Sequence, residues 1–220
     1  MNRSSFIPAA TRLGLAAIML FVCAGVVLSQ DKAEKADKAL KAEYKAKYKE
    51  FCSNNWSNGD KVSVSDLRET TVASTGSLNV DGGRNGGIKV QGENRSDIAL
   101  RACVQAWGVS EEAAKAIASS IRINTTGGLV RAEGPEENGW SVSYEARVPS
   151  STNLKLTAKN GGIAISSVEG VLELETMNGG ISLKDVAGDV RGKTTNGGVS
   201  VSLSGTSWKG NGLDVQTTNG

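Results

Sequence analysis

The sequence predicts an all-β-dominated protein in which short strands stack as a two-sided β-solenoid of about 18 residues per rung. Asn-Gly-Gly recurs at 160–162, 178–180 and 196–198, a constant interval of eighteen residues. Apolar and polar residues alternate on both sides of each copy, which is typical of strands with one buried face. No single unit could bury its apolar face alone, so the repeats are expected to share one core.

Aligning the repeats places residues of like character in columns. Two inward columns on the first strand are Leu154, Leu172, Val190, Leu213 and Leu156, Leu174, Gly192, Val215, the last member of each following five inserted residues. On the second strand they are Ile163, Ile181, Val199 and Ile165, Leu183, Val201. Gly192 is an exception that the pattern does not explain.

The outward and corner columns support the same register. Lys155, Glu173, Arg191 and Asp214 form an outward column that alternates in charge, and such cross-strand pairs stabilise register. Asn160, Asn178, Asn196 and Asn219 are expected to form an amide ladder at one corner. The glycine pairs that follow are expected to adopt backbone angles that other residues resist.

The start of the chain predicts export to the periplasm, the cell surface or the medium. Residues 1–29 carry Arg3 and Arg12 before an apolar run at 13–28, which is typical of a signal peptide removed near Gln30. Two alternatives remain open: an uncleaved membrane anchor, and lipid attachment at Cys23, for which the preceding residue is bulky. Apart from this segment, no membrane contact is expected.

Two helical segments are expected. Residues 30–51 consist mostly of Ala, Lys and Glu with a thin apolar stripe, and predict either a solvated spacer or a cap on the first rung. Residues 110–121 form an inserted helix with Ser110 as its N-cap. Residues 52–220 are expected to form the β-strand-repeat domain, which is predicted to be truncated at its C-terminal end.

The cysteines and the absence of histidine limit the chemistry. After removal of the signal peptide, Cys52 and Cys103 remain as an even pair, which predicts a disulfide in an oxidising compartment. The chain contains no His, which excludes Ser-His and Cys-His nucleophile pairs and imidazole metal ligands. Carboxylate or lysine chemistry would remain, but the sequence shows no catalytic cluster, and no catalytic residue, metal or cofactor is predicted. The 25 basic and 23 acidic residues nearly cancel, so no nucleic-acid partner is expected.

Binding residues are expected on one outer face and in one inserted loop. The flat, small face of the second strand offers Ser182, Ser200, Ser202 and Lys184. The loop at 205–212 carries Trp208 beside Lys209, which could contact a sugar ring or a partner side chain. The alternative for Trp208 is that it folds back over the apolar end of the adjacent rungs.

The exported start, the cysteine pair, "VQAWGVSEEAAKAI", "WSVSYEARVPSSTNLKL" and the Asn-Gly-Gly repeats together resemble the bacterial putative-adhesin family, a β-strand-repeat domain of unknown function. The resemblance covers about residues 70–220 and implies an envelope-associated, β-solenoid-like domain without established catalysis. We therefore expect a non-enzymatic adhesin-like binding or scaffold domain, with wall polysaccharide or an envelope protein as candidate partners. Two alternatives are a polysaccharide-active enzyme on a β-solenoid and an envelope-stress accessory protein that binds a membrane partner.

Overall fold

The computed structural model describes residues 35, 51–53, 60–136, 139–204 and 207–220. The chain divides into two units, Met1–Phe51 and Cys52–Gly220. The predicted signal peptide and nearly all of the predicted helical segment at 30–51 lie outside the described residues. Within the described part of the chain, no helix has the length and apolar character needed to span a membrane.

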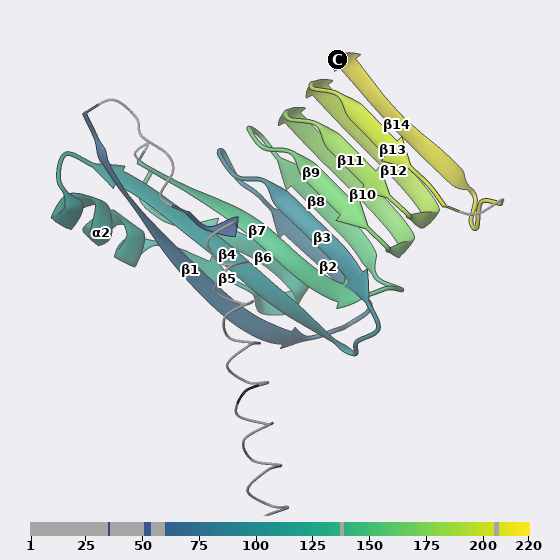
Figure 1. Cartoon of the computed structure of the whole chain (residues 1–220), viewed down its shortest axis with the longest axis horizontal. Helices are drawn as coiled ribbons and strands as arrows, with labels where there is room; N and C mark the ends of the chain where they lie inside the picture. Colours follow the sequence, from purple (N-terminus) through teal and green to yellow (C-terminus); the bar gives the residue numbers. More distant parts are fainter. Residues whose placement is uncertain (1–34, 36–50, 54–59, 137–138, 205–206) are drawn as a thin grey trace, which may run out of the picture. The chain divides into compact units, whose positions relative to one another are not determined.

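Strands dominate the second unit (Figure 1). In chain order the elements are β1 (Val62–Ala73), β2 (Ser77–Asp81), β3 (Ile88–Glu93), β4 (Asp97–Gly108), α2 (Glu111–Ser120), β5 (Arg122–Asn124), the short 3-10 helix η2 (Thr126–Gly128), β6 (Leu129–Glu133), β7 (Trp140–Pro149), β8 (Asn153–Ala158), β9 (Ile163–Ser166), β10 (Glu169–Asn178), β11 (Ile181–Lys184), β12 (Ala187–Asn196), β13 (Val199–Ser202) and β14 (Gly212–Asn219).

These strands form two seven-stranded sheets with different strand orders. The first sheet runs β1-β4-β7-β3-β9-β11-β13, and the second runs β14-β12-β10-β8-β2-β6-β5. From β8 onward, consecutive strands alternate between the two sheets, and each pairs in parallel with the strand two positions later. In Figure 1 these strands follow one another from β8 to the yellow β14.

The predicted columns are confirmed as strand pairings. Leu172 pairs with Leu154 and Val190, each eighteen residues away, and Val190 pairs with Leu213 after the insertion. Ile181 likewise pairs with its predicted partners in β9 and β13. The alternation of apolar and polar residues was therefore sufficient to set the register, because a one-residue slip would expose every inward side chain.

The repeat begins earlier in the chain than the eighteen-residue interval indicates. The strand β2 pairs in parallel with β8, and β3 pairs in parallel with β9, so that Leu78 aligns with Leu154 and Ile88 with Ile163. The strands β4 to β7 and the helix α2 are inserted between these two rungs. Within this insertion β4 runs antiparallel to both β1 and β7.

The inserted helix α2 is capped at both ends. The Ser110 side chain accepts a hydrogen bond from the Ala113 amide, which confirms the predicted N-cap. At the other end, the guanidinium of Arg68 in β1 donates to the carbonyl oxygens of Ala118 and Ile121. A cation at this position satisfies backbone acceptors and opposes the negative end of the helix dipole.

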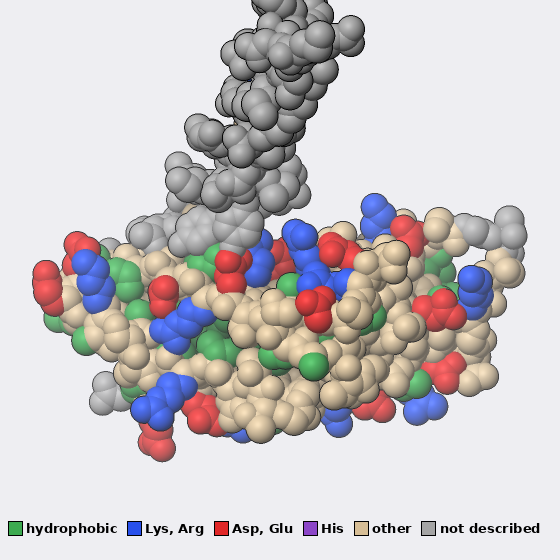
Figure 2. Space-filling view, turned by 90° about the horizontal axis from the view of Figure 1, so that it is seen from below, with side chains coloured by type: hydrophobic (Ala, Val, Ile, Leu, Met, Phe, Trp, Pro, Cys, Tyr) green, Lys and Arg blue, Asp and Glu red, His purple; other side chains and the backbone are tan. Residues whose placement is uncertain are grey.

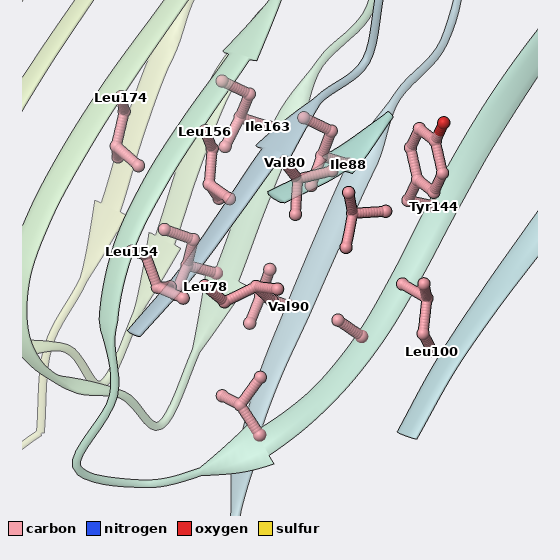
Figure 3. Close-up of a cluster of buried hydrophobic side chains, with 14 of the residues drawn as sticks. Leu78, Val80, Ile88, Val90, Leu100, Tyr144, Leu154, Leu156, Ile163 and Leu174 are labelled. Atoms are coloured by element: carbon pink, nitrogen blue, oxygen red, sulfur yellow. The ribbon is translucent and has the colours of Figure 1, made fainter. Parts of the chain in front are cut away.

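The core lies between the two sheets and is built from alternate residues of each strand (Figure 3). Leu78 and Leu156 from one sheet meet Ile88 and Ile163 from the other, and all four are at most 2% exposed. Tyr144 of β7 belongs to the same core and is 1% exposed. Its hydroxyl approaches the Ala132 backbone without making a hydrogen bond of ordinary geometry, and burial raises the pKa of that hydroxyl far above its usual value.

The structure explains why Gly192 interrupts an apolar column. A β-carbon at this position would lie 3.0 Å from Cγ1 of Val215 and 3.5 Å from Cδ1 of Ile181. The branched side chain of Val215, on the adjacent strand, therefore occupies the space that a larger residue at position 192 would need.

The reason predicted for the paired glycines at the corner is wrong. Neither glycine of the three repeated Asn-Gly-Gly motifs has a positive φ. Instead, a β-carbon at Gly161, Gly179 or Gly197 would lie 2.1 to 2.4 Å from a carbonyl oxygen of the preceding rung. The first glycine of each pair is required because two backbones approach closely there.

Candidate functional site

A ladder of hydrogen-bonded asparagines runs along the corner between the two sheets. The predicted contacts are present: Asn219 donates to Asn196 at 2.9 Å, Asn196 to Asn178 at 2.8 Å and Asn178 to Asn160 at 2.7 Å. The ladder continues one step further than predicted, because Asn160 donates to Oδ1 of Asn85 at 3.0 Å. All four bonds run from Nδ2 to Oδ1 in the same direction.

Sequence reasoning missed Asn85, although a signal for it exists. Asn85, Gly86, Gly87 and Ile88 repeat the letters of residues 160–163, but the separation is 75 residues because the insertion lies between them. The segment that connects β2 to β3 supplies the first amide of the ladder.

A cavity of about 360 Å³ lies where the ladder ends. Its lining comes from four separate segments: Gln105 and Trp107 of β4, Ser141 and Ser143 of β7, Asn85 with Gly86 and Gly87, and Asn160. We call this cavity the ladder-end pocket. Among the residues that the structure describes, every side chain that lines it is uncharged.

The pocket's side chains are held by the sheet and its turn. Gln105 pairs with Ser141 across the β4–β7 ladder, and its Nε2 donates to the Ser53 carbonyl at 3.3 Å. The Ser143 hydroxyl oxygen accepts from the Gly87 amide at 3.3 Å. Gln105 and Trp107, two residues apart in β4, project from the face opposite to the core residues Val104 and Ala106.

The predicted small face is present on the outer side of β9, β11 and β13. Ser182 pairs with Ser200, and Lys184 pairs with Ser202, so these four candidate residues lie together and all are exposed. Ala164 and Ser166 continue the two rows onto β9. The rows form a surface without large side chains apart from Lys184.

The other two candidates, Trp208 and Lys209, lie apart from the serine rows, at the corner that joins the end of β13 to the start of β14. There they line a groove of about 890 Å³ together with Val168, Val186 and Leu203. Trp208 is half-buried against the core, and its indole N–H donates to the Gly188 carbonyl at 3.1 Å. This placement favours the covering role for Trp208 over an exposed platform.

The inserted loop is also fixed by Asp189. The Asp189 carboxylate accepts hydrogen bonds from the backbone amide and the side-chain amide of Asn211, at 2.7 and 2.8 Å. The backbone hydrogen bond from Asn211, followed by the side-chain one, lowers the pKa of Asp189. The described part of the insertion is therefore tied to the preceding rung at two points, Gly188 and Asp189.

Replacing Trp208 with Ala tests the role of this side chain. Because the indole covers apolar side chains and satisfies a carbonyl, we expect W208A to lower the free energy of unfolding by about 3 kcal/mol in urea titrations. Lys209→Ala is the matched control at the neighbouring, exposed position, and it should change stability by less than about 0.5 kcal/mol. An unchanged stability in W208A would instead support the contact role.

The outer face of the other sheet carries alternating charges. Glu173 pairs with Lys155 and with Arg191, and Arg191 pairs with Asp214. The Lys155 ammonium lies 3.8 Å from the Glu173 carboxylate. A second row, including Glu175 beside Lys193, runs parallel to the first, and a shallow cavity of about 420 Å³ lies between them. Figure 2 likewise shows positive and negative side chains interspersed, without a broad field of one sign.

Reversing Arg191 should weaken this face. In R191E, three like charges would follow one another on adjacent strands, and we expect a loss of about 1 kcal/mol by urea unfolding at low salt. Arg191→Gln, which removes the charge without adding repulsion, should cost less. The double change R191E/D214R restores one opposite pair and should recover part of the loss, whereas strict additivity of the two changes would contradict the coupling.

Another row of charges crosses the first sheet, with Arg101 and Glu145 buried at its centre and Lys89 and Glu69 exposed. The Glu145 carboxylate lies 2.7 Å from Nη1 of Arg101 and 3.0 Å from Nζ of Lys89, and Nε of Arg101 lies 3.1 Å from Glu69. Burial raises the pKa of Glu145, but the hydrogen bonds and charges of Lys89 and Arg101 outweigh it and lower that pKa below its ordinary value. The positive and negative charges of this row neutralise one another.

This row predicts a pH dependence of stability. Because the folded-state pKa of Glu145 is below the unfolded value, its contribution is complete above the unfolded pKa and is lost as the pH falls through the folded pKa. E145Q should therefore lower the free energy of unfolding by about 2 kcal/mol at pH 7. The difference in this free energy between E145Q and the wild type should become smaller below about pH 4. Urea titrations across pH would measure this, with the exposed Glu173→Gln as the control. A difference that stays constant with pH would contradict it.

The disulfide between Cys52 and Cys103 is present, with the two Cα atoms 5.4 Å apart. It joins Cys52 to the outer side of β4, where Gln105 also contacts Ser53. Among the residues that the structure describes, no group of three or more Cys, Asp or Glu is placed to hold a metal ion.

Comparisons with known proteins add little. No model of a known protein family matches the chain, and no curated protein matches it. Among solved structures, it is similar to a "putative lipid binding protein" of Parabacteroides distasonis (9% identity, TM-score 0.35, 66% of this chain and 61% of that chain). It is also similar to a "putative adhesin" of the same species (7%, 0.31, 61% and 73%) and to a "putative cell adhesion protein" of Clostridium sporogenes (8%, 0.33, 69% and 98%). This chain thus spans 61% of the length of the first. Likenesses at these TM-scores carry no argument about function.

Proposed function

We propose that this chain is an exported, non-enzymatic β-solenoid that acts as an adhesin-like binding or scaffold domain of the cell envelope. The observation that carries the proposal is the flat outer face of β9, β11 and β13, on which Ser182, Ser200, Ser202 and Lys184 are exposed in register. A rigid, two-layered stack fixes these groups at constant spacing, which suits contact with an extended or repetitive partner.

The chemistry of the faces agrees with binding rather than catalysis. The serine rows offer hydroxyl donors and acceptors, and the charged rows of the other sheet pair among themselves. The disulfide supports the exported location, because such bonds persist in oxidising compartments.

Envelope fractions and purified wall polysaccharide offer a direct test. We expect immobilised full-length mature chain to capture one of these materials and the double variant S182R/S200R to lose it, since two arginines would break the flat surface. Val171→Arg, an exposed change on the opposite sheet, is the matched control and should leave capture unchanged. Equal capture by all three proteins would contradict the serine face as the contact surface.

A further inference from the structure

The ladder-end pocket lies apart from the serine face and from the groove beside Trp208. An indole and several uncharged polar side chains meet there around a cavity of about 360 Å³. We infer that this pocket binds a sugar unit of an uncharged glycan. The inference rests on the proposal that the chain is a binding domain, but it concerns a site apart from the serine face.

The asparagine ladder presents a polar group to this pocket. In a ladder of side-chain amide hydrogen bonds that all run in one direction, each end residue keeps one group without a partner in the ladder. This group is the NH2 at one end and the carbonyl oxygen at the other. At the pocket end this group is Nδ2 of Asn85, for which no acceptor is found among the described residues, whereas its Oδ1 accepts from Asn160. Successive hydrogen bonds polarise one another, so the four bonds behind Asn85 make it a fixed, strengthened donor.

The remaining lining offers both surfaces that a sugar ring needs. The ring of a hexose has C–H groups on its faces and hydroxyl groups at its edge. Trp107, which is half-buried, provides a rigid apolar wall of the kind that packs on such faces. Gln105, Ser141 and Ser143 supply amide and hydroxyl groups around it, which can donate to or accept from sugar hydroxyls.

Charge and topology favour a glycan over other ligands. No charged side chain of the described residues lines the pocket, so none of them compensates the charge of a phosphate or carboxylate ligand. A peptide that binds by strand addition needs an open sheet edge, but β4, β7, β3 and β9 are neighbours inside one sheet. The volume lies near the lower end of the range for small-molecule pockets, which suits one or two sugar rings.

An array of uncharged oligosaccharides, with glucose, galactose, mannose and N-acetylglucosamine oligomers as probes, tests the inference on the full mature chain. We expect at least one series to bind, and isothermal titration with the bound oligomer should show an affinity at least tenfold lower for W107A. Trp107→Phe should retain more affinity than W107A, because it keeps an aromatic face. Gln105→Leu is a second test, which can still be made if W107A does not fold. It preserves the side-chain volume but removes the amide, so it should weaken binding several-fold.

Two controls separate this site from the others. W208A changes a tryptophan outside the pocket, and S182R/S200R changes the serine face, so neither should alter oligosaccharide affinity. The inference is overturned if no oligomer binds, or if an oligomer binds with equal affinity to the wild type, W107A and Q105L. Capture of envelope material that S182R/S200R abolishes, together with no oligosaccharide binding by the wild type, would uphold the proposed function while overturning the sugar site.

Discussion

Replacing Gly179 with Ala is expected to lower the free energy of unfolding by about 3 kcal/mol or more. The added β-carbon would lie 2.2 Å from the carbonyl oxygen of Gly161 and 2.8 Å from the amide nitrogen of Gly162. Both contacts are with backbone, which cannot rotate away as a side chain can. The two rungs would have to separate at the corner, where Asn178 donates to Asn160.

The next Asn-Gly-Gly copy supplies a matched control. At Gly198 a β-carbon would meet no heavy atom within 4 Å, and the residue has no positive φ. Gly198→Ala should therefore change stability by less than about 0.5 kcal/mol. Urea unfolding of both variants measures the contrast, and a similar loss in both would show that glycine is needed at this corner for its flexibility and not for close approach.

The register of the repeats could be predicted from sequence because the information is local and periodic. Alternation fixes which side chains of a strand point inward, and the constant eighteen-residue interval fixes which residues stack, as for Leu154 above Leu172. The cap at Ser110 was predictable for the same reason, since a helix N-terminus is a short-range signal.

The extent of the repeat was not predictable in this way. The first rung, β2 with β3, is separated from β8 and β9 by an insertion, so that Ile88 and Ile163 pair although they are 75 positions apart. A search for a fixed period cannot find a partner across such a gap. The letters of Asn85-Gly86-Gly87-Ile88 were the available clue, but without the interval they also fit an isolated turn.

The surroundings of individual side chains were the part of the site that was hardest to predict from the sequence. The ladder-end pocket gathers residues from β4, β7 and two corner turns, and only the three-dimensional pairing brings Gln105 next to Ser141. The two roles open for Trp208 likewise depended on whether the insertion folds back. The hydrogen bond from Trp208 to Gly188 shows that it does, which periodicity could not reveal.

Removing the disulfide should also have a large effect, because Cys52 and Cys103 are 51 residues apart. By closing a loop, the bond restricts the unfolded chain. For a loop of this length, the chain-entropy model gives about 4 kcal/mol of stabilisation. Cys103 projects from β4 on the side away from the core residues Ala102 and Val104, so its replacement by Ser should leave the packing between the sheets intact.

The double variant C52S/C103S of the mature chain, begun near Gln30 so that Cys23 is absent, tests this without leaving a free thiol. We expect its urea midpoint to fall and the reductant dithiothreitol to have no further effect on it. The same reductant should lower the wild-type midpoint to a similar value, since both treatments release the segment that contains Ser53 from the outer side of β4. Non-reducing peptide mapping of the exported protein should recover Cys52 and Cys103 in one linked peptide pair. Recovery of both as free thiols, or a wild-type midpoint that reductant does not change, would contradict a stabilising disulfide.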